Sequence, residues 1–401
     1  DFLGSGIESF AMGGAATAVA RDPLALDTNP AGLAWQRARA IEQHIAVARA
    51  IDVGFSDALN PDQDVTNRYA PIADGGIAFP LAGLPVTVSH NLTVAGGSGA
   101  AFRDVATSFG TIDELAAKFG ILRTTLGAGA HFGDRFAVGI GGSLYYARLD
   151  QKIFPGTSVF NAANPAHSFF GTYLHGASGV SGGAIVGAQY RVNERVTIGA
   201  TWRNKVDLPL SGGHFTVDET ALGLGRVDYR ALSVAGLAEP QRVALGIAWQ
   251  ATPRLLIALD VKWLDWSGAL TQSRLHAGNP ATPGAPPVSA ISGLHWRDQY
   301  VLALGAAFDL TPATVLWAGY NYGRDPIPAA TLNPLLGAIG EHHVTAGFGW
   351  RISPRWMLGM AAEYLLPTTA PSTDAELPLA PGLRVNTGYF AVHAGLRWTW
   401  R

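Results

Sequence analysis

Hydrophobic residues recur at every second position in several stretches of the chain, and this is the period of a β-strand whose two faces meet different surroundings. Residues 243–249 read VALGIAW, with large apolar side chains at the odd positions and Ala or Gly between them. Residues 255–263 repeat the pattern, but carry Asp260 and Lys262 on the other face. One face suits lipid and the other tolerates small or charged groups, which is typical of a transmembrane barrel strand.

Stretches of this kind total about fourteen, an even number, as single-chain bacterial barrels require. The connections between them alternate between tight turns and long segments, which predicts a short-turn periplasmic rim and a long-loop outer rim. We therefore predict an all-β fold, a 14-stranded antiparallel transmembrane β-barrel. The expected strands are residues 37–49, 74–82, 84–96, 121–132, 134–149, 180–192, 195–206, 240–251, 253–267, 296–309, 312–323, 341–352, 354–366 and 388–401.

The composition supports a membrane barrel. The chain is 48% hydrophobic and only 14% charged, whereas soluble domains carry about 25% charged residues. It has no run of about 18 apolar residues, so a membrane-spanning helix is not expected. The expected location is the outer membrane of a Gram-negative bacterium. Export is inferred from the architecture, because Asp1 is interpreted as a mature or trimmed start without a visible signal peptide.

Other chemistry finds little support in the sequence. A net charge of −2 gives no electrostatic reason to expect nucleic acid as a partner, and the chain has no cysteine for a thiol metal site. Among eleven histidines there is no helical His-x-x-x-His motif. The adjacent His342 and His343 should point to opposite faces of a strand. We therefore predict no metal, no catalytic residues and no cofactor.

Residues 1–36 do not follow the strand pattern. They are rich in Gly and Ala and end in Asn29, Pro30, Ala31 and Gly32. A segment of small residues before the first strand predicts a plug inside the lumen, where backbones must pack closely, followed by the barrel over 37–401. The alternatives are a loose periplasmic tail, or a simple turn at Asn29–Gly32 that leads into the first strand.

Residues 97–120 and 150–179 are predicted to be long outer loops. Residues 111–114, Thr-Ile-Asp-Glu, resemble a helix capping box before an apolar run. We therefore expect a short amphipathic helix in the first of these loops, at the outer rim.

Several motifs occur in an order and spacing similar to one known family. They include Ala20-Arg21-Asp22 followed by residues 29–33 (NPAGL), residues 126–129 (LGAG) with 145–148 (YYAR), residues 260–267 (DVKWLDWS), residues 319–322 (GYNY) with 325–328 (DPIP), and residues 341–344 (EHHV). With them the chain resembles the FadL/TodX family of outer-membrane transporters for long-chain fatty acids and aromatic hydrocarbons, over nearly its whole length.

The resemblance implies a barrel blocked by an N-terminal hatch that includes Asn29, Pro30, Ala31 and Gly32, lying against a break in the wall at strand three. It implies passive uptake, with capture at the outer loops, hatch movement and sideways exit into the bilayer. An apolar ligand gains roughly 0.8 kcal/mol per CH₂ by staying out of water. Strand three contains residues that are poor choices for a regular strand, and they are the predicted lateral opening: His90, Asn91, Gly96, Gly97 and Gly99.

Aromatic residues in the two long loops are candidate ligand contacts, although they could instead pack the loops together. Arg148 and Lys152 are candidates for holding a carboxylate, and Arg203 and Lys262 are further positions to consider. Some fatty-acid members place an Arg near the position of Ile153, and its absence here permits a neutral ligand. The candidate aromatic residues are Phe102, Phe109, Phe119, Phe154, Phe160, Phe169, Phe170 and Tyr173.

Four functions therefore compete, with uptake of a hydrophobic small molecule in the lead. A barrel esterase or phospholipase would use a Ser-His pair such as Ser89 and His90, but no Gly-x-Ser-x-Gly elbow is present. A secretion-linked or structural barrel is a further alternative, and a porin for polar solutes would need an open lumen. The expected partners are an apolar ligand, the lipid bilayer and lipopolysaccharide, and the barrel is expected to be a monomer.

Overall fold

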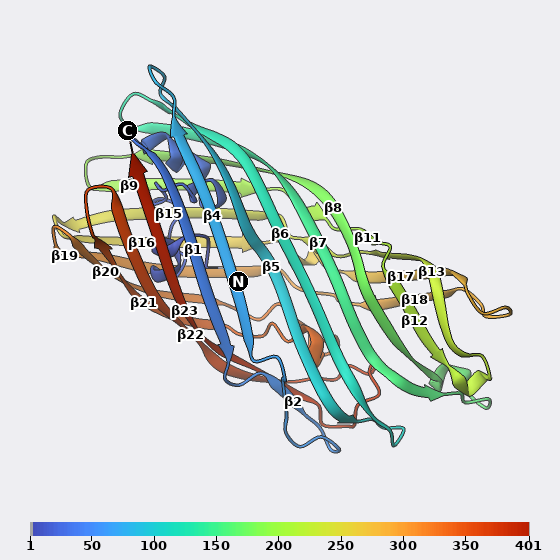
Figure 1. The fold of residues 1–401 in the computed structure, drawn as a ribbon. Helices are drawn as coiled ribbons and strands as arrows, with labels where there is room; N and C mark the ends of the chain where they lie inside the picture. The colour runs from blue at the N-terminus through green and yellow to red at the C-terminus, as the bar shows by residue number, and fades with distance from the viewer. Residues whose placement is uncertain (1–2, 401) are drawn as a thin grey trace.

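Fourteen long antiparallel strands close into a barrel in the computed structural model, which describes residues 3–400 (Figure 1). Asp1 and Arg401 lie outside the described residues. Each long strand pairs with the next along the chain, and β23 pairs back to β1 from Arg39 with Trp400 to Ala50 with Tyr389. The long strands are β1 (Arg39–Ala50), β4 (Tyr69–Pro80), β5 (Val86–Ala106), β6 (Ile112–Phe132), β7 (Phe136–Val159), β8 (Phe169–Arg191), β9 (Val196–Arg203), β15 (Arg242–Thr252), β16 (Leu255–Leu264), β19 (Gln299–Thr311), β20 (Thr314–Gly323), β21 (His342–Arg351), β22 (Trp356–Pro371) and β23 (Arg384–Trp400).

Shorter elements occupy the connections and the N-terminal segment. The short strands are β2 (Gly54–Ser56), β3 (Gln63–Asp64), β10 (Val206–Asp207), β11 (Leu210–Ser211), β12 (His214–Glu219), β13 (Gly225–Ala235), β14 (Ala238–Glu239), β17 (Gln272–Pro280) and β18 (Val288–Gly293). The helices are α1 (Ile7–Ala11), α2 (Ala25–Thr28), α3 (Trp266–Ala269) and the 3₁₀ turns η1 (Pro30–Trp35), η2 (Pro165–His167), η3 (Thr220–Leu222) and η4 (Pro334–Leu336). Among the described residues, no helix is both long enough and apolar enough to cross a membrane.

The alternation predicted from the sequence is confirmed along the strands. On β15, Leu245 is 58% exposed on the outer face while Ala244 is buried on the inner face. On β16, Val261 is exposed, whereas Asp260 and Lys262 are buried inside the barrel. The outer face therefore presents large apolar side chains, and the inner face carries the charged ones.

The two rims also differ as predicted. The turns at 133–135, 192–195, 253–254, 312–313 and 352–355 are short and lie at the rim where β1 begins and β23 ends. At the opposite rim the strands run on into long hairpins and extra short strands, which Figure 1 shows at the lower right.

The prediction of a helix after Thr111 is wrong, and much of 97–120 and 150–179 is strand rather than loop. Leu115 pairs with Phe102 on β5 and with Ile153 on β7, and this pairing buries it completely. Asp113 does not cap a helix, because its Oδ2 atom accepts hydrogen bonds from Gly156 N and from Thr157 Oγ1, both at 2.8 Å. Cross-strand partners thus override the local helix signal.

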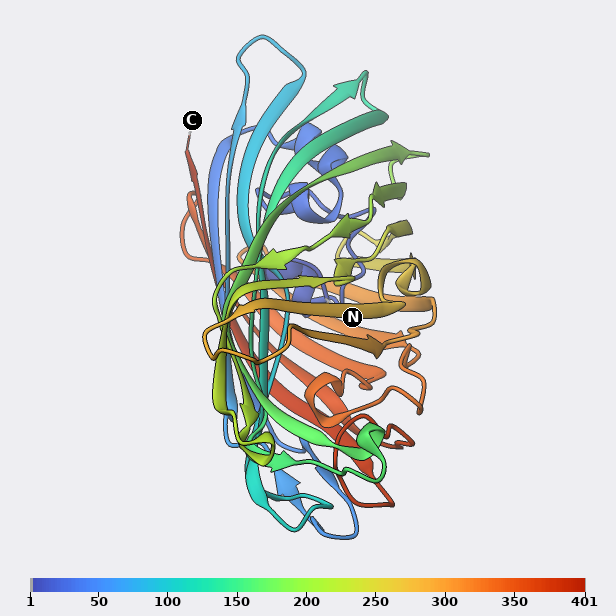
Figure 2. The same cartoon turned by 90° about the vertical axis from the view of Figure 1, so that its right-hand side faces the viewer.

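The N-terminal segment, residues 3–36, lies inside the barrel against its inner wall (Figure 2). Asp260 Oδ2 on β16 accepts hydrogen bonds from Ala16 N, Thr17 N and Thr17 Oγ1 at 2.6–3.0 Å. Asn321 on β20 donates to Gly13 O, and Thr345 on β21 donates to Ala11 O. Inward-facing polar side chains therefore satisfy backbone groups of a segment that has little regular structure of its own.

Candidate functional site

The sheet is interrupted between β4 and β5. These strands pair from Pro80 with Thr87 to Gly75 with Leu92, and the pairing then stops. Beyond that point β4 pairs only with β1, and β5 continues on β6 alone, up to Ala106. We call this unpaired stretch of the barrel wall the wall gap.

Hydrogen bonds close the wall gap at both ends. At the end nearer the periplasmic rim, Asp74 Oδ1 on β4 accepts a hydrogen bond from Val94 N at 3.1 Å, next to a register shift between Val94 and Gly96. At the end nearer the outer rim, Thr66 N donates to Ala101 O at 2.8 Å and Asn67 Nδ2 donates to Gly99 O at 3.1 Å. The gap is therefore a bounded window in the wall, with backbone groups on its edges that no neighbouring strand pairs.

A cavity of about 330 Å³ joins the wall gap to the N-terminal segment. At the gap it is lined largely by apolar or small residues, among them Ile72 on β4 and Val94 and Gly97 on β5. Leu3 and Phe10 of the N-terminal segment line its inner side. The part of the cavity next to the gap is therefore mainly apolar, a surface that suits a hydrophobic molecule better than a polar one.

Charged residues gather at the other end of the cavity. Arg123 on β6 and Arg203 on β9 both bond Asp27 Oδ1 of the N-terminal segment, the second at 3.1 Å. Ser5 Oγ donates to Asp27 Oδ2 at 2.6 Å, and Arg203 also donates to Tyr145 OH at 3.0 Å. Burial alone would raise the pKa of Asp27, but the two guanidinium groups hold that pKa below its ordinary value. Asp27 is therefore a buried carboxylate that ties the N-terminal segment to the barrel.

A second polar network begins at the periplasmic end of the gap. Asp74 bonds His44 Nδ1 at 3.1 Å, and His44 Nε2 lies 3.1 Å from His393 Nδ1. His393 and His343 both bond Glu363, at 3.2 and 2.8 Å. The ring of Phe10 packs on His44 and His393 with centroid distances of 4.8 and 4.6 Å. This network couples the gap edge, four other strands and the N-terminal segment.

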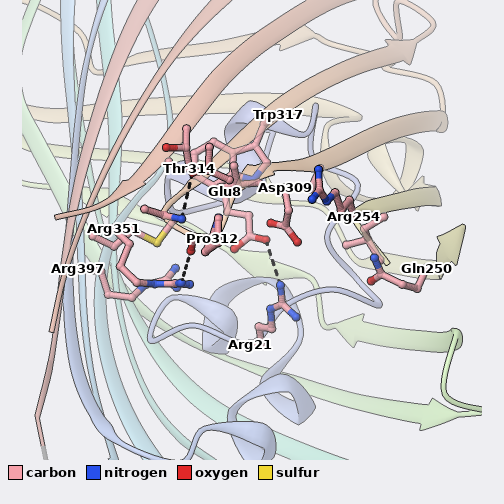
Figure 3. A pocket seen from close by; sticks show the side chains of 17 residues that line it. Glu8, Arg21, Gln250, Arg254, Asp309, Pro312, Thr314, Trp317, Arg351 and Arg397 are labelled. Atoms are coloured by element: carbon pink, nitrogen blue, oxygen red, sulfur yellow. Dashed lines mark hydrogen bonds and ion pairs between the residues drawn. The ribbon is translucent and has the colours of Figure 1, made fainter. Parts of the chain in front are cut away.

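The periplasmic mouth of the barrel has a different character (Figure 3). It holds a cavity of about 630 Å³ whose lining includes Arg21, Arg254, Arg351 and Asp309. Arg21 lies 3.8 Å from Glu8 within the N-terminal segment. Such a lining favours water and ions over an apolar molecule.

Among the described residues, no group of three or more His, Asp or Glu could hold a metal ion.

The motif at Asn29–Gly32 lies against β6, β7 and β8, and not at the wall gap as expected. Asn29 Nδ2 donates to Thr17 O at 2.7 Å and to Ala188 O at 3.1 Å, and its Oδ1 accepts from Ala31 N. Gly139 and Gly187 have no side chain at the positions where Pro30 and Asn29 pack. Gly32 packs in turn on Ala20 O, which leaves no room for a larger residue.

The five residues predicted for the lateral opening fall into two groups. Gly97 and Gly99 line the cavity from the β5 edge, and Gly96 sits at the register shift beside them. His90 is exposed on the outer face, where its Nε2 bonds Thr124 Oγ1. Asn91 is buried in the paired part of β5 and faces Pro23 of the N-terminal segment.

The predicted aromatic contacts are spread over the outer hairpins, and none of them lines the cavity. Phe102 and Phe154 are buried in an apolar cluster, and Phe169 lies 6.1 Å from Phe154 and 5.9 Å from Phe109, centroid to centroid. The members outside this group are Phe119 and Phe170, packed on a second apolar cluster, Phe160, which is exposed, and Tyr173, which stacks on His175.

The two predicted outer cations are paired and partly exposed. Arg148 binds Asp150 at 3.1 Å, and Lys152 binds Glu114 at 2.7 Å. The sequence interpretation missed Asp27, Arg123 and Arg242, which line the cavity. The two-residue period could have identified Arg123, because it lies between Ile121 and Thr125 on the inward-facing positions of its strand.

The fold is shared with solved transporters. Over 100% of both chains, the structure superposes on the P. putida toluene transporter TodX with a TM-score of 0.80 at 17% identity. The Ralstonia pickettii toluene transporter TbuX gives 0.80 at 17% identity over 100% and 99% of the chains. A Pseudomonas aeruginosa FadL homologue gives 0.79 at 16% identity, covering 99% and 98%.

The sequence itself decides the family, because residues 4–401 match the profile of the outer membrane protein transport proteins (OMPP1/FadL/TodX). The chain belongs to this family. No curated protein matches the chain. As a member of the OMPP1/FadL/TodX family, it is an outer-membrane transport protein of a Gram-negative bacterium and not an enzyme. Family membership thus confirms the predicted class of function, transport of hydrophobic compounds.

Proposed function

We propose that this protein carries small apolar molecules across the outer membrane passively and releases them sideways through the wall gap between β4 and β5. The observation that carries the proposal is the continuous cavity from the N-terminal segment to that gap, with Ile72 and Val94 on its two edges. An apolar cavity of this kind can hold aliphatic acids as well as aromatic hydrocarbons, such as the toluene named for TodX and TbuX.

The charge distribution along the barrel supports sideways release. A molecule that continued along the axis would meet the N-terminal segment and then the arginine-lined mouth with Arg254 and Arg351. An apolar molecule gains nothing there, whereas each CH₂ that stays out of water is worth roughly 0.8 kcal/mol. The wall gap instead leads toward the lipid-facing surface of the sheet.

The N-terminal segment acts in this proposal as a hatch. It borders the cavity through Leu3 and Phe10 and is held to the wall by Asp27. Movement of residues 3–10 would widen the cavity while the Asn29–Gly32 motif stays anchored against β6 to β8. The buried aromatic residues of the outer hairpins, such as Phe102 and Phe154, stabilise the extended hairpins above the cavity, and the exposed Phe160 is a candidate for first contact.

Filling the gap tests the route. A Cβ atom added at Gly99, on the β5 edge of the gap, would make only ordinary contacts, 3.7 Å from Ala117 O and from Asn67 Nδ2, so Gly99→Trp adds an indole at the edge of the gap with little backbone strain. Gly142→Trp is the matched control, because Gly142 is exposed on β7 with nothing within 4 Å of an added Cβ.

We expect cells that carry Gly99→Trp to take up labelled oleate and labelled toluene at the rate of cells without the protein. Cells with Gly142→Trp should match the wild type. Heat-modifiable electrophoretic mobility verifies that both barrels are folded. Wild-type uptake by the folded Gly99→Trp barrel would exclude the wall gap as the route.

A further inference from the structure

The outer surface of β7 changes from apolar to polar at a defined point along the strand. Phe136, Ile140, Leu144 and Tyr146 face outward and are exposed, while the alternate residues face the lumen. The span from Phe136 to Tyr146 is about the 9–11 residues with which a strand crosses a bilayer, and aromatic residues mark its two ends. Tyr146 therefore lies at the outer interface of the membrane. Arg148, the next outward-facing residue, lies at the lipid head groups.

Polar side chains continue from Arg148 across the neighbouring strands. Each of them pairs in register with the next, so they share the outward face of the sheet. Ser211, Ser233 and His276 are exposed there. Hydroxyl and imidazole groups can form hydrogen bonds with sugars and phosphates, which acyl chains cannot offer. In order, the row contains Arg148 on β7, Ser178 on β8, Ser211 on β11, Ser233 on β13 and His276 on β17.

Five Lys and Arg side chains lie on the same outward face, and we call them the basic band. The strands that carry them lie on one flank of the barrel and are joined through β8 and β12 (Figure 1). Within residues 3–400, Lys118, Arg230 and Arg274 make no ion pair. Exposed cations that the chain does not neutralise attract an anionic partner. The band contains Lys118 on β6, Arg148 and Lys152 on β7, Arg230 on β13 and Arg274 on β17.

The carboxylates on this face do not cancel the charge of the basic band. Arg148 pairs with Asp150 at 3.1 Å and Lys152 with Glu114 at 2.7 Å, and the two cations are 44% and 42% exposed. Exposed ion pairs contribute little to stability, so either cation can exchange its partner for a phosphate oxygen. A third carboxylate, Asp228, lies 3.2 Å from a histidine of β12. Positive charge therefore exceeds negative charge among these residues.

We propose that the basic band binds the phosphorylated disaccharide head group of lipid A, the membrane anchor of lipopolysaccharide in the outer leaflet. Guanidinium and ammonium groups bind phosphate, and the neighbouring serines can bond the sugar hydroxyls. The acyl chains of the same lipid would cover Leu144 and Val180, which are exposed on the membrane side of the band. This inference concerns the lipid around the barrel and does not depend on the route of the transported molecule.

The extent of the basic band favours lipid A over an ordinary phospholipid. Arg148 and Lys152 are four residues apart on one strand, about 13 Å at 3.3 Å per residue. Lys118 lies on the next strand, opposite Asp150. A head group with one phosphate cannot contact cations at both ends of this stretch, whereas the two phosphates of a disaccharide can.

Lipid A with and without its phosphates tests the basic band. The probes are bisphosphoryl lipid A, the same lipid with both phosphates removed, and phosphatidylglycerol. Each is titrated into the purified full-length barrel in detergent micelles, and native mass spectrometry measures the complex. We expect wild type to bind bisphosphoryl lipid A at least about tenfold more tightly than either other lipid, because each basic group at the surface attracts an anionic lipid.

Two double variants locate the binding. Lys118→Gln with Arg148→Gln should weaken binding of bisphosphoryl lipid A about tenfold or more and leave that of the dephosphorylated lipid unchanged. Arg135→Gln with Arg195→Gln removes two exposed cations from the turns at the periplasmic rim and should bind like wild type. Heat-modifiable electrophoretic mobility verifies that both barrels are folded.

Three results would overturn the proposal. Equal affinities of wild type for lipid A with and without phosphates, or no binding of any lipid, would show that phosphate is not recognised. Equal affinity for phosphatidylglycerol would show that the disaccharide is not recognised. Equal binding by the two double variants would show that the basic band is not the site.

Discussion

Single glycines on the inner wall determine where the N-terminal segment can lie. At Gly139 on β7, an added side chain would overlap the backbone of Pro30, and at Gly187 on β8 it would overlap the Asn29 amide. Asn29 then completes the fit by bonding both its own segment and Ala188 O. Loss of either glycine should displace the motif without preventing barrel closure, because the strand pairing does not depend on it.

Gly139→Val tests this dependence. The isopropyl group cannot fit beside Pro30, so we expect the N-terminal segment to leave the wall and ion conductance in planar bilayers to rise above that of wild type. Gly142→Val lies on the same strand but in open space and should conduct like wild type. Unchanged conductance for Gly139→Val would show that this contact does not hold the segment.

The sequence could predict only whether a strand residue faces the lumen or the lipid, because odd and even positions of a strand point to opposite sides. The two-residue period correctly assigned Asp260 and Lys262 to the inside. It could not show that Asp27, more than ninety positions from Arg123 in sequence, is its partner. Partners across the lumen depend on how the N-terminal segment folds, and the sequence of that segment shows no regular hydrophobic period from which its fold could be predicted.

At the scale of elements, all fourteen long strands were predicted, but several were predicted too short. β7 continues to Val159 and β8 begins at Phe169, whereas the pattern indicated 134–149 and 180–192. Apolar and polar residues alternate along a strand when one of its faces contacts lipid. Outside the membrane, both faces of the strand contact protein or water. There the signal is lost although strand pairing continues, so the outer hairpins had to come from the structure.

The last three strands, β21 to β23, are joined by side chains as well as by backbone. Glu363 on β22 accepts hydrogen bonds from Tyr389 on β23 at 2.6 Å and binds both His343 on β21 and His393 on β23. A carboxylate with these partners fills a position that no apolar residue can satisfy, because three polar groups would be left unpaired.

Glu363→Ala should therefore destabilise the barrel by about 3–5 kcal/mol, the usual cost of breaking a buried charged network. Urea-induced unfolding of the protein in lipid vesicles measures it. Glu376→Ala removes an exposed loop carboxylate that accepts a hydrogen bond from Gly293 N, and should cost little. Equal stability of the two variants would mean that the network contributes nothing to the fold.

At the scale of the whole molecule, three regions along the barrel have separate chemistry. Apolar clusters stabilise the outer hairpins, a cavity with both apolar and charged lining lies beside the N-terminal segment, and an arginine-rich mouth faces the periplasm. The barrel and the plug-like position of the segment could be predicted from strand period and small residues. The extent of the wall gap could not, since it depends on where the pairing of β4 with β5 ends.

We propose that the ligand leaves through the wall and not along the axis. The most direct test is photo-crosslinking of the full-length protein in lipid vesicles with a diazirine-bearing alkanoate, followed by mass spectrometry of the labelled peptides. We expect adducts on the two edges of the wall gap, within 69–74 and 94–99, and none at the mouth around Arg254 and Arg351. Adducts at the mouth without labelling of the gap would contradict it.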